Sequence, residues 1–93
     1  MKIIQSRRFA RKIKKFSKDQ KPQLDLAILE ILHNPVVGER KKGDLKDTFI
    51  HKFYIGNTLY LLAYSFSSDQ LELIMIGPHE NYYKDLKNYL KKR

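Results

Sequence analysis

The strongest constraint on the fold is a pair of aromatic and aliphatic segments, residues 48–56 and 58–66, which meet at Gly56-Asn57. Such side chains favour strands, and Gly-Asn between two of these runs indicates a tight hairpin turn. A second turn rich in Ser and Asp follows. It leads into residues 71–76, an almost continuous apolar run that is typical of a central strand. The chain therefore contains a predicted three-stranded antiparallel meander.

The hairpin turn also decides which side chains share a face, because it places Ile55 opposite Thr58 and His51 opposite Leu62. One face is apolar enough to pack against helices and carries Phe49, His51, Phe53, Ile55, Tyr60, Leu62, Tyr64 and Phe66. The opposite face carries Ile50, Lys52, Tyr54, Leu59, Leu61 and Ala63. A lysine and a tyrosine hydroxyl on this second face point away from the core, so we expect the functional site there.

The N-terminal third predicts a short strand, residues 2–5, followed by two helices. The first helix has Ser6 as its candidate N-cap and an apolar stripe at helical spacing, Phe9, Ile13 and Phe16. The second helix begins after a Ser-x-x-Gln capping box and ends before Pro35, because a residue that precedes proline avoids the α conformation. Its apolar positions are Leu24, Ala27, Ile28, Ile31 and Leu32. We expect these helices to form an antiparallel hairpin against the apolar face of the meander.

The remaining segments complete an α+β fold. Residues 36–47 hold glycines and charges without apolar periodicity, so we expect a mobile basic loop. Gly77-Pro78 is expected to break the last strand, and residues 79–93 predict a C-terminal helix with the stripe Tyr82, Leu86, Tyr89 and Leu90. The predicted architecture is a small antiparallel sheet, made of the N-terminal strand and the meander, packed on the helical hairpin. A chain of 93 residues has room for one domain, residues 1–93.

Charge and composition narrow the function. The chain carries 19 Lys and Arg against 10 Asp and Glu, a net charge of +9 that attracts polyanions. Nucleic acid, an anionic membrane surface and an acidic protein all fit this charge. A membrane fits least, because the helices lack a broad apolar face, and the basic surface favours nucleic acid or the ribosome. There are no cysteines and no long apolar run, so we expect a soluble cytoplasmic protein. Without a metal-binding motif or a phosphate-cradling glycine loop, we expect neither a metal nor a small-molecule cofactor.

The order of these elements resembles the RelE/ParE superfamily of toxins from bacterial type II toxin–antitoxin systems. Three local segments carry the resemblance, namely Leu29-Glu30-Ile31-Leu32-His33-Asn34-Pro35, Leu61-Leu62-Ala63-Tyr64, and Ile76-Gly77-Pro78-His79-Glu80-Asn81-Tyr82-Tyr83. The last segment is similar to the YafQ/RelE-type branch of messenger RNA endonucleases. The resemblance implies a metal-independent, ribosome-dependent endoribonuclease that acts on mRNA and is held inactive by a cognate acidic antitoxin protein.

By position, the resemblance makes His79 the general acid and Tyr83 the aromatic residue of the site. Lys52 and Tyr54 occupy sheet positions that are catalytic in RelE-type toxins, whereas Leu61 stands where RelE has an arginine. RNA can be cut by its own 2′-hydroxyl, so a protein need only move protons and neutralise the phosphorane. An imidazole suits the acid role because it titrates near neutrality. A helix N-terminus lowers a histidine pKa, and a bound phosphate raises it.

The other candidate residues have competing interpretations. His51 lies on the apolar face, where a hydrogen-bonded core role is more common than catalysis, and His33 suits the C-terminus of a helix. RNA-binding residues are expected in the basic loop, at Arg40, Lys41, Lys42 and Lys46. Two alternative functions stay open: a ParE-like toxin that inhibits DNA gyrase without RNA chemistry, and a basic RNA- or protein-binding domain without catalytic activity.

Overall fold

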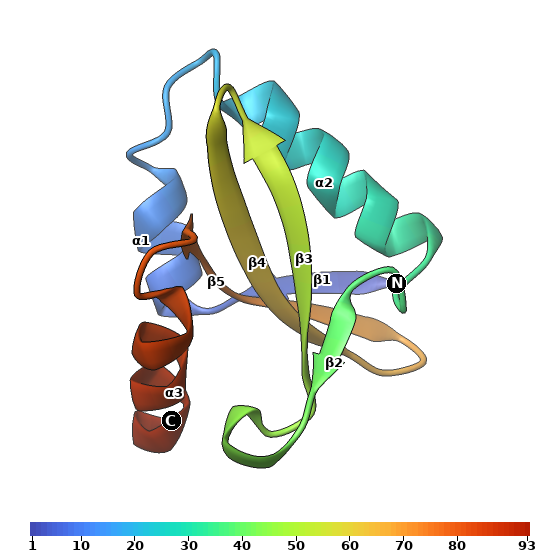
Figure 1. Ribbon diagram of the computed structural model, residues 1–93. Coiled ribbons are helices and arrows are strands. Elements are labelled where there is room, and N and C mark those ends of the chain that lie inside the picture. The colour runs from blue at the N-terminus through green and yellow to red at the C-terminus, as the bar shows by residue number, and fades with distance from the viewer.

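The computed structural model describes residues 1–93 as a five-stranded sheet with helices on both faces (Figure 1). The strand order is β1-β5-β4-β3-β2; β1 is parallel to β5, and all other neighbours are antiparallel. The strands are β1 Lys2–Gln5, β2 Glu39–Lys41, β3 Thr48–Ile55, β4 Thr58–Phe66 and β5 Gln70–Pro78. The helices are α1 Arg7–Ile13, α2 Lys21–His33 and α3 Tyr82–Lys92, with a 3₁₀ turn, η1, at Gly43–Leu45. The predicted α+β fold class is confirmed, and none of the helices is long and apolar enough to span a membrane.

The β3–β4 hairpin has the predicted register. Ile55 pairs with Thr58, and His51 pairs with Leu62. Gly56 has a φ of +60° while Asn57 stays outside the positive region. Glycine at the first central position is the requirement of a type II′ turn, whose twist matches that of the flanking strands.

Helix α1 begins at its predicted cap, and α2 begins at Lys21, directly after the capping box. The Ser6 hydroxyl accepts a hydrogen bond from the Phe9 amide at 2.9 Å and donates to the Ile74 carbonyl at 2.5 Å, which fastens α1 to β5. The capping box forms two reciprocal hydrogen bonds between Ser17 and Gln20, of 2.9 and 3.3 Å. Helix α1 ends before Phe16, yet that ring is still buried in the core.

The segment 36–47 differs from the predicted mobile loop. Residues Glu39–Lys41 form an edge strand that pairs with β3, and η1 follows it. An edge strand of three residues is held by backbone pairing and carries charged side chains, so it leaves no apolar periodicity in the sequence. Charged edge strands are one way in which proteins avoid unwanted pairing with other chains.

The end of β5 also differs from the prediction. Gly77 pairs with Leu61 and Pro78 with Tyr60, so the strand continues through the expected break. Because the His79 amide donates to Leu59 in β4, at 3.0 Å, the preceding proline nitrogen faces the outer edge, where β1 no longer pairs. Helix α3 then starts at Tyr82 and not at His79, because Asn81 has a left-handed φ of 58°.

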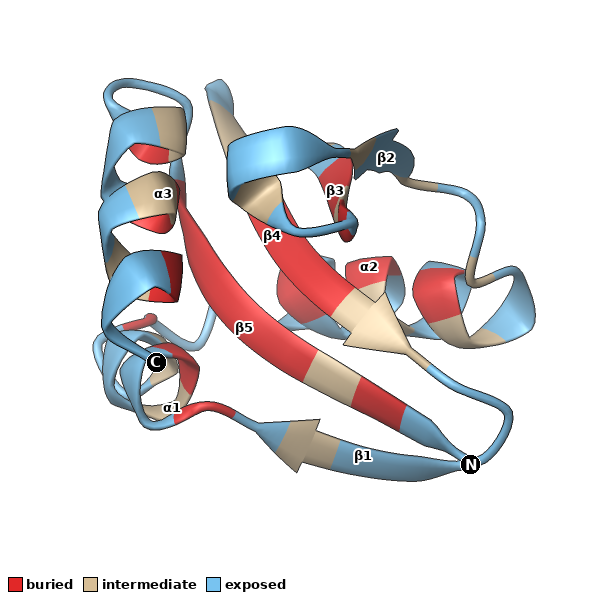
Figure 2. Cartoon of the chain, turned by 90° about the horizontal axis from the view of Figure 1, so that it is seen from below, coloured by how far each residue is buried: buried red, intermediate tan, exposed pale blue.

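Two hydrophobic cores lie on the two faces of the sheet (Figure 2). Helices α1 and α2 share one face and bury the larger core, which includes Phe9, Ile31 and Tyr64. Helix α3 covers the other face with its apolar stripe Tyr82, Leu86 and Leu90. The predicted core stripes of all three helices thus face the sheet.

Candidate functional site

The candidate face of the meander is only partly covered. Ile50, Leu61 and Ala63 are buried beneath α3. Lys52 and Tyr54, which follow Ile50 on the same face of β3, are exposed, and Tyr54 keeps 64% of its surface accessible. The hairpin end of this face is therefore an open strip beside a closed core.

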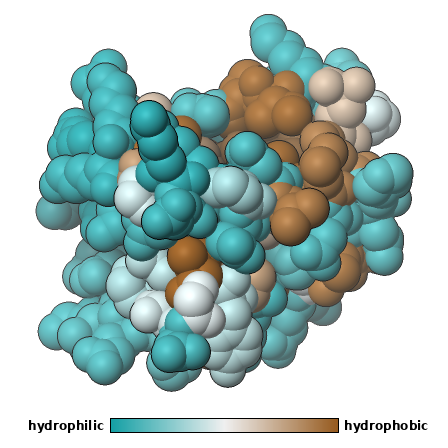
Figure 3. Space-filling view, turned by 90° about the horizontal axis from the view of Figure 1, so that it is seen from above, coloured by the Kyte–Doolittle hydropathy of each residue, from teal (hydrophilic) through white to brown (hydrophobic).

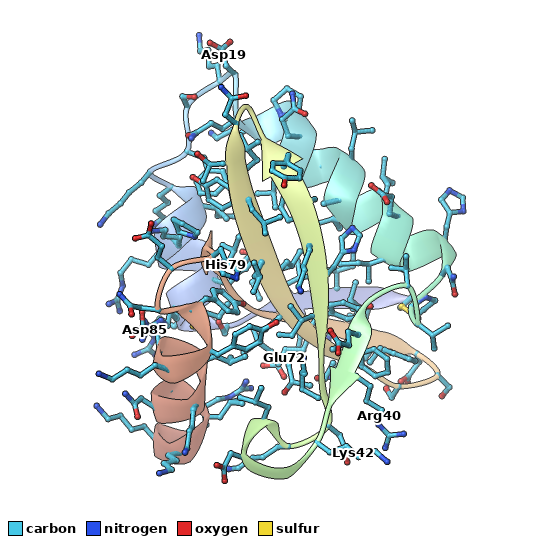
Figure 4. All side chains as sticks on the ribbon, in the orientation of Figure 1. Asp19, Arg40, Lys42, Glu72, His79 and Asp85 are labelled. Atoms are coloured by element: carbon cyan, nitrogen blue, oxygen red, sulfur yellow. The ribbon has the colours of Figure 1, made fainter.

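His79 lies at the edge of this open strip. Its amide donates to the Leu59 carbonyl, and Leu59 pairs with Tyr54, so the three residues form one row across β5, β4 and β3. Neighbouring strands lie about 4.8 Å apart, which puts the Cα atoms of Tyr54 and His79 about 10 Å from each other. His79, labelled in Figure 4, is exposed in the connection between β5 and α3. It lies in a hollow that Asn57, Thr58 and Glu80 also line.

Two adjacent tyrosines at the start of α3 have different environments. Tyr82 is buried, and its hydroxyl donates to the Met75 carbonyl at 2.6 Å; burial raises the pKa of this hydroxyl far above its usual range. Tyr83 is half-buried and meets Tyr82 edge-to-face at 5.9 Å. The Lys41 ammonium lies 5.3 Å from the centre of the Tyr83 ring. Tyr83 therefore lies at the edge of the α3 core, beside Lys41 of β2.

The structure adds Lys41 to this face in a way that the sequence did not indicate. Lys41 pairs with Thr48 at the start of β3, which places its side chain on the same face as Lys52. Its ammonium is 3.1 Å from the Glu39 carboxylate. A hydrogen bond to Glu39, together with the nearby Tyr83, raises the pKa of Lys41. The sequence did not indicate this position, because residues 39–41 were expected to belong to a loop and a loop has no defined face.

Most of the predicted RNA-binding cations of this segment have partners within the chain. The guanidinium of Arg40 lies 3.2 Å from the Asp47 carboxylate, and the Lys46 ammonium donates to the Leu90 carbonyl at 3.2 Å. Only Lys42 has neither a salt bridge nor a side-chain hydrogen bond. In the view of Figure 4, Arg40 and Lys42 lie well below His79. These cations thus lie away from the row that contains His79.

The other histidines do not join this site. His51 is 8% exposed on the opposite face, beneath α2, and its Nε2 has no hydrogen-bond partner. Desolvation lowers the pKa of His51, while the Glu30 carboxylate at 3.7 Å opposes that shift. His33 is exposed in the last turn of α2. No cluster of three or more His, Asp, Glu or Cys side chains is arranged to bind a metal ion.

Solved structures share this fold. The chain matches E. coli RelE in the intact RelBE toxin–antitoxin complex with a TM-score of 0.68 and 20% identity, over 85% of this chain and 96% of that one. A free-state E. coli RelE with two arginine-to-alanine substitutions gives a TM-score of 0.73 at 18% identity, over 99% and 95% of the two chains. Isolated E. coli RelE in another crystal form gives 0.63 at 19% identity, over 95% and 97%. The chain therefore has the fold of E. coli RelE.

A family model defines the class more closely. The model for the ParE-like toxin of type II bacterial toxin–antitoxin systems matches residues 3–87. The chain therefore belongs to this toxin family. A search of curated protein sequences found no significant match.

Proposed function

We propose that the chain is the toxin of a toxin–antitoxin pair and cuts messenger RNA on the ribosome without a metal ion. Family membership and the RelE fold support the toxin role. The observation that carries the enzymatic part is that an imidazole, a lysine and a tyrosine, namely His79, Lys52 and Tyr54, share the exposed face at the hairpin end of the sheet, and Tyr83 begins the helix that follows His79.

These groups can supply the chemistry of RNA cleavage. The 2′-hydroxyl loses its proton to solvent water as its oxygen attacks the adjacent phosphorus, the P–O bond to the 5′-oxygen breaks, and a 2′,3′-cyclic phosphate forms. His79 protonates the leaving 5′-oxygen, and the Lys52 ammonium neutralises the extra charge of the phosphorane. Tyr54 and Tyr83 stack on bases next to the scissile bond and hold it in line. Stacking is available to Tyr54 because its ring is largely exposed.

The experiment follows cleavage of a reporter mRNA on translating ribosomes. His79→Ala should lower the rate about 100-fold or more, the usual scale of general acid catalysis, with little change in ribosome affinity. His33→Ala is the matched control, because His33 is an exposed histidine on the far helix. EDTA should have no effect. Cleavage of a substrate whose scissile nucleotide lacks the 2′-hydroxyl would refute the mechanism, and normal cleavage by His79→Ala would remove His79 from it.

The proposed function includes an inhibitory partner. E. coli RelE occurs in a complex with its antitoxin, and a chain of net charge +9 favours an acidic protein in the same role. Expression of the chain alone should arrest growth, and co-expression with an acidic protein encoded beside it should restore growth. The partner should also raise the melting temperature, because it binds only the folded state. Normal growth with abundant folded toxin would contradict the proposal.

One observation favours a second candidate function, inhibition of DNA gyrase. The matching family model is described as ParE-like, and Leu61 is fully buried at the position where RelE-type toxins carry an arginine. This function needs no acid, so His79→Ala would stay toxic. Plasmid supercoiling would then change while mRNA ends stay intact, which separates the two functions in one culture.

A further inference from the structure

A cleft with a volume of about 600 Å³ lies between α1 and α3, away from Lys52 and Tyr54. It exists because α1 packs on one face of β5 and α3 on the other, next to the part of the strand that β1 does not reach. Residues Met75–Pro78 of β5 form its floor. In Figure 1, α1 and α3 lie together on the side of the molecule opposite α2.

The walls of the cleft are strongly basic. Seven of its lining residues are Lys or Arg and two are acidic, Glu80 and Asp85. Four of the cations lie on α1, namely Arg7, Arg8, Arg11 and Lys12, and a fifth, Lys15, follows the end of that helix. None of these five has a salt bridge within the chain, in contrast to the paired cations of β2. Like charges four residues apart on a helix repel each other. This repulsion destabilises α1, and a bound polyanion would relieve it.

Helix α3 contributes to the cleft the ring of Tyr89, which two guanidinium groups contact. The guanidinium of Arg8 lies 5.3 Å from the centre of the Tyr89 ring, and that of Arg93 lies 5.7 Å from the same centre. Stacking on an aromatic ring fixes the orientation of a guanidinium and leaves its N–H donors free at the edge. The N–H donors are free at Arg8, whereas the guanidinium of Arg93 is already bound to the carboxylate of Glu72. The tyrosine therefore links cations from two helices that are far apart in the sequence.

We propose that this cleft binds the phosphodiester backbone of a single RNA strand. Successive turns of α1 present cations about 6 Å apart, which suits a run of phosphates and not one isolated anion. Guanidinium groups match phosphate oxygens in a bidentate manner. The cleft volume is in the range of sites for small organic ligands, so it takes a few nucleotides of one strand and excludes a duplex.

An acidic protein segment is the competing occupant, and the distribution of apolar side chains disfavours it. Protein partners gain most of their affinity from apolar or aromatic anchors that enter pockets. No large exposed hydrophobic side chain lines the cleft, whereas Leu26 and Leu29 are more than half exposed on α2. Figure 3 shows the apolar surface gathered on the side of the molecule where α2 lies, and hydrophilic side chains on the other. A phosphate backbone needs no such anchor.

The cleft lies next to the hollow of His79, because Pro78 and Glu80 line both. A strand held by the α1 cations therefore leads toward His79. This connection rests on the proposed function, whereas binding in the cleft does not. RNA with 2′-O-methyl riboses cannot be cut by its own hydroxyl, so it measures binding alone. A chain that binds this RNA but cuts no mRNA would refute only the proposed function.

The test is fluorescence anisotropy with a labelled 2′-O-methyl RNA of about twelve nucleotides, at salt concentrations from about 50 to 200 mM. The variant Arg11→Gln/Lys12→Gln/Lys15→Gln should bind at least about tenfold more weakly and flatten the slope of log K against log salt by about 2, since each phosphate contact contributes about 0.7. The control Lys14→Gln/Lys18→Gln/Lys21→Gln removes the same charge from exposed residues outside the cleft.

The control should keep the wild-type slope, and an equal loss in both variants would overturn the proposal in favour of a diffuse surface charge. An oligoglutamate of equal charge should compete poorly; if it displaces the RNA and binds the cleft variant less tightly, the cleft is a protein site and the proposal fails. Single-stranded DNA of the same sequence distinguishes the source of the phosphate. A tenfold preference for that DNA would assign the cleft to DNA instead. Thermal unfolding verifies that each variant is folded.

Discussion

The two faces of the meander show how differently one pair of strands can be used. Toward α1 and α2, the side chains of β3 and β4 are covered so fully that His51 keeps 8% of its surface exposed. Toward α3, the side chains of the same strands are only partly covered. Leu61 is fully buried, whereas Lys52 and Tyr54 on the neighbouring strand are exposed. Two helices close the first face, and one helix is too narrow to close the second. The uncovered strip is where side chains can meet a substrate without weakening the core.

The largest expected effect comes from placing a charge on the closed part of this face. Leu61→Arg puts a guanidinium beneath α3 and should lower the free energy of unfolding by about 3–5 kcal/mol, because a buried charge has no partner there. Tyr54→Arg is the control on the open part of the same face and should change stability by less than about 0.5 kcal/mol. Urea unfolding measures both. Equal effects of the two substitutions would mean that α3 does not close its half of the face.

The neighbouring tyrosines of α3 give a smaller contrast. Tyr82→Phe removes the hydroxyl that donates to the buried Met75 carbonyl and should cost about 1–3 kcal/mol, because that carbonyl loses its partner. Tyr83→Phe should cost less than about 0.5 kcal/mol, since its hydroxyl forms no hydrogen bond within the chain. If Tyr83→Phe lowered the urea stability more than Tyr82→Phe, the two hydroxyls would have the opposite roles to those that their environments indicate.

The closed face should also respond to pH through His51. Its pKa is lowered from 6.5 in the folded chain, so the unfolded chain binds a proton more readily. The stability that comes from the neutral imidazole is complete above pH 6.5 and is lost as the pH falls toward the lowered folded pKa. His51→Leu should therefore flatten the loss of stability below pH 6.5, whereas His33→Leu, on the outer side of α2, should leave it unchanged. Chemical denaturation at several pH values measures this, and an unchanged slope in His51→Leu would contradict it.

The smallest effect on stability is expected at the exposed contact between η1 and α3. The Asp44 carboxylate lies 3.0 Å from the Lys87 ammonium, and a hydrogen bond from Lys87 lowers the pKa of Asp44 below its ordinary 3.8. Lys87→Met should raise that pKa, which an NMR titration of the carboxyl carbon would detect. The stability linked to this pKa is present above pH 3.8 and is lost at lower pH. Because exposed ion pairs contribute little to stability, the melting temperature at neutral pH should fall only slightly. A large drop in melting temperature would show that η1 fastens α3 over the sheet.

Local signals predicted the fold well where they coincide with buried periodicity. The hairpin turn at Gly56, the cap at Ser6 and the stripes of α2 and α3 are all in the structure, because each depends on residues close together in the chain. The edge strand β2 and the continuation of β5 through Pro78 were missed. Both depend on a neighbouring strand that the local pattern does not contain, and the proline fits only because the outer edge of β5 has no partner at that point.

The candidate site likewise has features that followed from the local sequence and features that depend on tertiary contacts. Lys52 and Tyr54 followed from strand alternation and hairpin register, and their shared exposed face is confirmed by the pairing of β3 with β4. Their roles, like those of His79 and Tyr83, stay proposals. The internal partners of Arg40, Lys41 and Lys46 were not foreseen, because each involves a contact that is set by how β2, η1 and α3 pack.

The sequence by itself determined which side chains share a face of each strand or helix, and whether that face is apolar or polar. Both depend on alternation along strands and on helical spacing, which are properties of neighbouring residues. It also determined an excess of positive charge without saying where that charge acts. Only the tertiary structure decided that α1 and α3 stand side by side across the free edge of β5, with their cations around one cleft. Contacts between residues about eighty positions apart, such as Arg8 with Tyr89, come from packing both helices on one strand, and no local pattern records them.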